Sequence, residues 1–74
     1  MIKIKESIRF DNIEEVIYES EYVWTATVQE GIEYALKLKD HGYTYIPERK
    51  MFVKYVSHPD PTVVSRLTTV FEEA

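Results

Sequence analysis

The stretch from Thr27 to Gly42 reads TVQEGIEYALKLKDHG, and it carries the clearest helix signals in the chain. Thr27 and Glu30 have the spacing of a capping box, in which each side chain accepts a hydrogen bond from the other residue's backbone amide. Gly42 suits the left-handed conformation that commonly ends a helix. We therefore expect a helix between these residues, with the rest of the chain packed around it.

One apolar stripe runs along this expected helix. Its members fall at i, i+4, i+7 and i+8, and one further leucine widens it: Val28, Ile32, Ala35, Leu36 and Leu38. Such a stripe is typical of a helix with one face against a core. The pattern predicts that these side chains are buried.

The N-terminal half of the chain predicts strands with one ambiguous segment between them. Residues 2–10 alternate apolar and polar side chains, which indicates a strand with one buried face. Residues 21–27 alternate in the same way. Between them, Asn12 and Glu15 have capping-box spacing, so we favour a short helix or turn over 11–20, with a strand as the alternative.

A hairpin is predicted next, with residues 43–46 and 51–57 as its strands and Pro47 to Lys50 as its turn. This register places Ile46 opposite Met51 and Tyr45 opposite Phe52.

Asp60 and Pro61 then suit the N-cap and first position of a second helix. The apolar residues that follow recur at helical spacing: Val63, Val64, Leu67, Val70 and Phe71. The expected fold class is therefore α+β, a single compact domain over residues 1–74. In it, an antiparallel sheet of about four strands carries two amphipathic helices packed on one face.

Composition limits the classes of protein that fit. The chain has 74 residues and no cysteine, which excludes a disulfide scaffold and cysteine-based zinc sites and is consistent with a reducing compartment. It has neither an apolar run of roughly 18 residues nor a signal-peptide pattern at Met1. We expect a cytoplasmic protein that starts at Met1 and does not enter a membrane.

Catalytic signals are weak throughout. His41 and His58 have no neighbouring nucleophile with a base and an orienting group, and the two glycines form no phosphate-binding loop. His58 and Asp60 have the side chains of metal ligands, but a linker with a capping Asp60 explains them more simply. We expect no enzyme, no cofactor and no metal site.

Charge is distributed unevenly. The net charge is −4, and residues 10–36 contain no Lys or Arg. Aromatic side chains of the kind that dominate protein interfaces lie in the same segment. The first hypothesis is a surface for a basic protein partner, made of Glu14, Glu15, Glu19, Glu30, Glu33, Tyr18 and Tyr34. A homodimer that buries its own aromatic face is a variant of this hypothesis.

The predicted hairpin supports an alternative. Its aromatic and basic residues suit a platform for stacking the bases of single-stranded nucleic acid: Tyr43, Tyr45, Arg49, Lys50, Phe52 and Lys54. The acidic net charge argues against this alternative, because phosphate contacts dominate nucleic-acid affinity.

In size and composition the chain resembles the small inhibitors that bacteriophages and other mobile elements make against host proteins, including anti-CRISPR proteins. The resemblance is one of type, and no residue is carried over from it. It implies a non-enzymatic protein-binding module.

Overall fold

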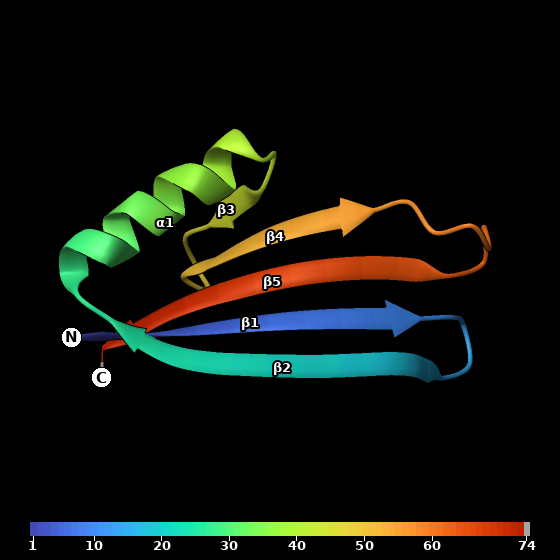
Figure 1. Ribbon diagram of the computed structural model, residues 1–74. Coiled ribbons are helices and arrows are strands. Elements are labelled where there is room, and N and C mark those ends of the chain that lie inside the picture. Colours follow the sequence, from blue (N-terminus) through green and yellow to red (C-terminus); the bar gives the residue numbers. More distant parts are fainter. Residues whose placement is uncertain (74) are drawn as a thin grey trace.

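The computed structural model describes residues 1–73 as a five-stranded antiparallel sheet with one helix on one face (Figure 1). The strands are β1 (Ile2–Asp11), β2 (Val16–Ala26), β3 (Thr44–Ile46), β4 (Met51–Val56) and β5 (Val64–Glu73). The helix α1 (Val28–Asp40) connects β2 to β3. The strand order is β2-β1-β5-β4-β3, so β1 and β5 lie inside the sheet and β2 and β3 are its edges.

The helix begins and ends as the sequence predicts. The Thr27 hydroxyl accepts a hydrogen bond from the Glu30 amide at 3.1 Å, and the Glu30 carboxylate accepts one from the Thr27 amide at 2.9 Å. Hydrogen bonds to the Glu30 carboxylate from the Thr27 backbone and side chain lower the pKa of this group, because they favour its charged form. Gly42 has φ +86°, the left-handed conformation expected after the last turn.

The buried face of α1 differs from the predicted stripe. Gly31 and Leu38 are buried and Tyr34 and Ala35 are half-buried, whereas three of the predicted core residues are exposed: Val28, Ile32 and Leu36. The physical reason is close approach at Gly31, where a Cβ atom would collide with the Ile2 side chain. Gly31, Tyr34, Ala35 and Leu38 also recur at helical spacing, and the contact with Ile2 turns this neighbouring stripe toward the sheet.

The predicted second helix is wrong, and so is the fold class of four strands and two helices. Residues 64–73 form β5, which pairs with β1 on one side, Ile4 opposite Phe71, and with β4 on the other, Met51 opposite Val70. The segment is rich in Val and Thr, which favour strands. Asp60 does accept hydrogen bonds from the Thr62 amide and hydroxyl, but this local turn leads into a strand and not into a helix.

Of the two alternatives for 11–20, a turn forms at 12–15 and the strand forms from Val16, while no helix forms. The Asn12 carboxamide oxygen accepts hydrogen bonds from the Glu14 and Glu15 amides at 2.9 Å, as an N-cap would. The backbone amide of Asn12 donates a hydrogen bond to the backbone carbonyl of Glu15. These contacts form the turn that reverses the chain. β2 begins at Val16 and includes most of the strand predicted at 21–27.

The β3–β4 hairpin has the predicted register, with Ile46 opposite Met51 and Tyr45 opposite Phe52. Lys50 closes its turn in the left-handed conformation, with φ 52°. The aromatic ring of Phe52 lies 5.8 Å from that of Phe71, in an edge-to-face contact that joins the hairpin to the core.

The helix covers only part of the sheet. With 13 residues, α1 is ~20 Å long, whereas the 10 residues of β1 extend over ~33 Å. Figure 1 shows α1 above the ends of the strands near the two termini, with the other half of that face bare. The core is therefore small and lies mainly under the helix, around Ile4, Ala26, Leu38 and Phe52, while Val53 is buried on the opposite face of the sheet.

Candidate protein-interaction surface

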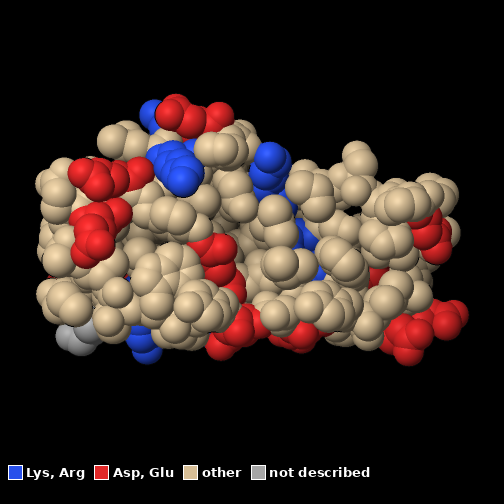
Figure 2. Space-filling model, viewed as in Figure 1, with Lys and Arg blue, Asp and Glu red and all other residues tan. Residues whose placement is uncertain are grey.

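The edge strand β2, the turn before it and the start of α1 form one acidic border, which we call the β2 margin. The turn contributes Glu14 and Glu15, and β2 contributes Glu19 and Glu21. Glu30 and Glu33 of α1 belong to it because they line a shallow hollow together with the last residues of β2, Trp24 to Ala26. Figure 2 shows acidic side chains along the lower and left borders of the view, where β2 and the start of α1 lie.

Apolar and aromatic side chains on β2 are exposed beside these carboxylates. Tyr22 is 68% exposed and Tyr18 is 50% exposed, and both lie on the face of the sheet that carries α1. Val16, Ile17 and Val23 are also exposed. A row of exposed apolar groups bordered by charge is the composition typical of a protein-binding surface.

The bare half of the helix-bearing face continues this surface across the sheet, and we call it the open half-face. Phe10 lies at its far end, with its ring 5.5 Å from those of both Tyr18 and His58. Nearer the helix lies Glu6, whose pKa is raised because burial disfavours the charged carboxylate. The pKa of Tyr43 is raised as well, mainly by burial and secondly by the negative charge of Glu6.

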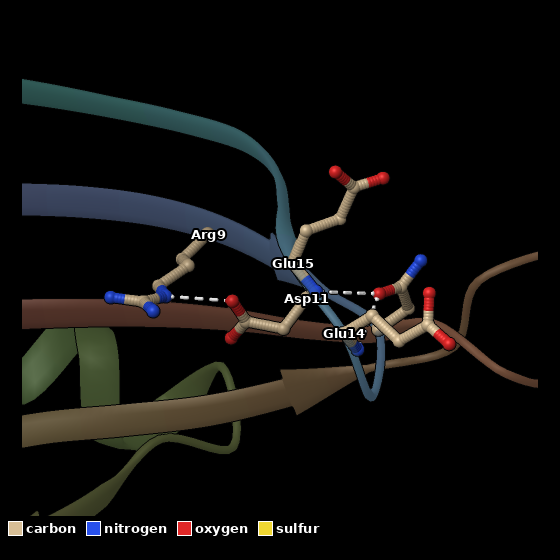
Figure 3. Close-up of polar contacts among 5 residues, drawn as sticks. Arg9, Asp11, Glu14 and Glu15 are labelled. Carbon is tan, nitrogen blue, oxygen red and sulfur yellow. Dashed lines mark hydrogen bonds and ion pairs between the residues drawn. The ribbon is translucent and has the colours of Figure 1, made fainter.

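Three cations on the opposite face of the sheet are paired with acids, whereas Arg66, which lies opposite Arg9, forms none of the ion pairs within residues 1–73. Lys3 lies 3.4 Å from Glu72, Lys5 lies 3.3 Å from Glu21, and the Arg9 Nε donates to Asp11 at 2.8 Å. Figure 3 shows the Arg9–Asp11 pair at the end of β1, with the Glu14 and Glu15 side chains directed away from it. The two turn glutamates are therefore free to meet a partner.

The residues predicted for protein binding are placed along the β2 margin rather than in a single patch. Glu14, Glu15, Tyr18 and Glu19 are at its turn end, and Glu30 and Glu33 are at its helix end. Tyr34 is different, because its ring faces inward against Trp24, at 5.6 Å, and Phe71, at 6.4 Å. Tyr34 is half-buried and supports the core more than it forms a surface.

The residues predicted for nucleic-acid stacking are partly used in the fold. Phe52 is buried against Tyr45 and Phe71. The Lys54 ammonium donates to the His41 carbonyl at 2.7 Å and lies 5.8 Å from the centre of the Tyr43 ring. Tyr45, Arg49 and Lys50 are exposed. Of the aromatic residues predicted for stacking, only Tyr45 is exposed, and the other exposed ring of the hairpin, Tyr55, belongs to the opposite face of the sheet.

Sequence reasoning left several surface residues out of the predicted site. Glu6, Ile8, Phe10 and Tyr22 all belong to the same face as Tyr18. The signal that could have found Tyr22 is the alternation of 18–24, which extends the predicted strand at 21–27 backwards, whereas Glu6, Ile8 and Phe10 join this face only through the pairing of β1 with β2.

Neither a group of side chains suited to hold a metal ion nor a helix long and apolar enough to cross a membrane occurs within residues 1–73. Comparisons with protein-family models, with curated proteins and with solved structures found no match for this chain.

Proposed function

We propose that this protein is a non-enzymatic protein-binding module that presents the β2 margin and the open half-face to a basic protein in the cytoplasm. The observation that carries the proposal is β2 itself, an 11-residue edge strand with two exposed tyrosines, two glutamates and no cation. By its resemblance in size and composition to bacteriophage inhibitors, we further propose that binding inhibits the partner.

The uncovered sheet supports a macromolecular partner. A sheet face that carries Ile8, Phe10 and Leu67 gains free energy when those groups leave water, at about 25 cal/mol for each Å² of apolar surface. The helix is too short to provide this cover over the whole face. A partner protein that lies on the open half-face would complete the second layer of the fold.

The charge distribution supports a basic partner. Glu14 and Glu15 form none of the ion pairs within residues 1–73, so their charges act on the surroundings of the molecule, while Glu19 lies opposite Arg9 in the pairing of β1 with β2. Exposed charges that attract over distance accelerate association, and salt screens them beyond ~8 Å at physiological ionic strength. We therefore expect partner binding to weaken as salt rises, mainly through the association rate.

The test is affinity capture from a cell lysate with the tagged protein, with and without nuclease, followed by two matched double variants. Glu14→Gln with Glu19→Gln removes two charges from the β2 margin. Asp40→Asn with Glu48→Gln removes two exposed charges near the end of α1 and in the β3–β4 turn. We expect the first pair to weaken capture of the protein partner and the second to leave it nearly unchanged.

The nucleic-acid alternative predicts a different result. If nuclease abolishes capture, and Arg49→Gln with Lys50→Gln weakens it while the glutamate variants bind normally, the proposal is wrong. Circular dichroism spectra of all variants provide the control for folding, since exposed charges contribute only about 0–1 kcal/mol each to stability.

A further inference from the structure

We infer that the partner binds by adding an extended segment as a sixth strand to the outer edge of β2, a mode that rests on the proposed function. β2 pairs only with β1 within residues 1–73, so the backbone amides and carbonyls along its outer side have no strand beside them. Main-chain hydrogen bonds to such an edge supply affinity for an extended peptide, and side-chain positions supply specificity.

The two edges of the sheet differ in how far they are open to pairing. β3 has 3 residues, too few to bind a long segment, whereas β2 has 11. Natural edges are commonly protected by lysine, proline or a covering element. β2 contains no lysine and no proline, and α1 lies only over its last residues, from Trp24 to Ala26. A bulge at Ile17 interrupts the ladder with β1, and the regular part of the edge, from Tyr18 to Val23, is open.

The two faces of β2 specify the sequence of the added strand. Directly opposed side chains of paired strands point to the same face of a sheet. On the helix-bearing face the added strand would lie beside Tyr18 and Tyr22, which favours apolar side chains. On the opposite face it would lie beside Glu19 and Glu21, which favours Lys or Arg. The segment should therefore alternate basic and apolar residues.

The same charges disfavour a second copy of this chain as the occupant. Antiparallel self-pairing about the middle of β2 would place Glu21 opposite Glu21 and bring both Glu19 side chains close to them. Like charges directly opposite destabilise paired strands. A basic segment replaces this repulsion with attraction.

The test uses a synthetic peptide of about seven residues that alternates lysine and valine, a length that spans the open part of β2. Binding is measured by titration of the isotope-labelled protein, with backbone amide NMR signals as the readout. A control peptide has the same residues in two blocks, one of valines and one of lysines. We expect the alternating peptide to bind at least about tenfold more tightly and to shift the amide signals of β2 more than those of β3.

Backbone methylation separates strand addition from binding by side chains alone. In an extended peptide the amides of alternate residues point to opposite sides, so only one set can face β2. One peptide is methylated on all its lysine amides and another on all its valine amides. We expect one of these two peptides to lose binding and the other to retain it within about threefold.

Three results would overturn this inference. They are equal effects of the two methylation patterns, amide shifts centred on the β3–β4 hairpin, and no binding of the alternating peptide. If any of these occurs while the Glu14 and Glu19 variants still weaken capture of the protein partner, strand addition is wrong and the proposed function stands. If those variants have no effect on capture, the proposed function itself fails.

Discussion

Two isoleucines of opposite burial offer a direct test of how the helix packs. Ile4 is 1% exposed on the interior strand β1 under the helix, whereas Ile32, on the predicted apolar stripe of α1, is 51% exposed. Ile4→Ala and Ile32→Ala remove the same atoms. The structure therefore predicts that the first variant loses much more stability than the second.

The magnitudes follow from burial. Complete burial of an isoleucine side chain is worth about 1.5–3 kcal/mol, and the cavity left by its truncation brings the cost of Ile4→Ala to about 3–4 kcal/mol. Truncation of the half-exposed Ile32 side chain loses roughly half of this burial free energy and leaves no closed cavity. The higher helix propensity of alanine offsets part of that loss, so Ile32→Ala should cost under about 1 kcal/mol.

The assay is thermal unfolding followed by circular dichroism. For a domain of this size each 1 kcal/mol shifts Tm by about 4–8 °C, so Ile4→Ala should lower Tm by about 12–30 °C and Ile32→Ala by less than about 8 °C. Chemical denaturation at one temperature checks that the unfolding slope is unchanged. Equal losses in the two variants would refute the packing described above and would favour the stripe with Val28, Ile32 and Leu36 as the buried face of the helix.

Two further predictions concern polar groups in the sheet. Ser65 is 2% exposed and its hydroxyl has no hydrogen-bond partner within residues 1–73, so Ser65→Ala should raise the free energy of unfolding by about 1 kcal/mol while the exposed Ser57→Ala should not; a lower Tm for Ser65→Ala would contradict this. Burial raises the pKa of Glu6 above its ordinary value of 4.5, so the folded state favours the protonated carboxyl and loses stability as pH rises through that raised pKa. Glu6→Gln should therefore melt at a higher temperature than the natural protein at about pH 7, with the difference shrinking toward about pH 4; a difference that does not change with pH would exclude the charge of Glu6 as its cause.

The parts of the fold that local chemistry determines could be predicted from the sequence. The capping box of Thr27 and Glu30 and the left-handed Gly42 fix the ends of α1 with contacts inside one segment. The turn after Pro47 fixes the register of the β3–β4 hairpin in the same way. In each case the residues that decide the structure are close neighbours in the chain.

The C-terminal strand could not be predicted this way because its residues satisfy two periods at once. Val63, Leu67 and Val70 recur at helical spacing, while Ser65, Leu67, Thr69 and Phe71 share one face of a strand. What decides between them is pairing with β1 and β4, and these partners lie far away in the sequence. Asp60 added to the ambiguity, since a side chain that caps a turn has the same signature as one that caps a helix.

The negative charge of the candidate site could be predicted from the sequence, but its position on a sheet edge could not. The absence of Lys and Arg from residues 10–36 is plain in the sequence, and in the structure this segment supplies the turn, the edge strand β2 and the first part of α1. That β2 is an edge depends on the strand order, which follows from where β5 pairs. Because β5 was predicted as a helix, neither the edge nor the open half-face was apparent.

The charge of β2 connects its folding to its proposed use. An uncharged edge strand with Val16, Ile17, Tyr18 and Tyr22 exposed would pair readily with its own copies. Glutamates on such an edge prevent self-pairing as effectively as lysines would, because like charges repel in either case. They differ in which foreign segments they admit, since glutamates accept a basic strand and lysines an acidic one. If β2 binds an added strand as proposed, glutamate at these positions would both disfavour pairing between copies of this chain and select a basic partner segment.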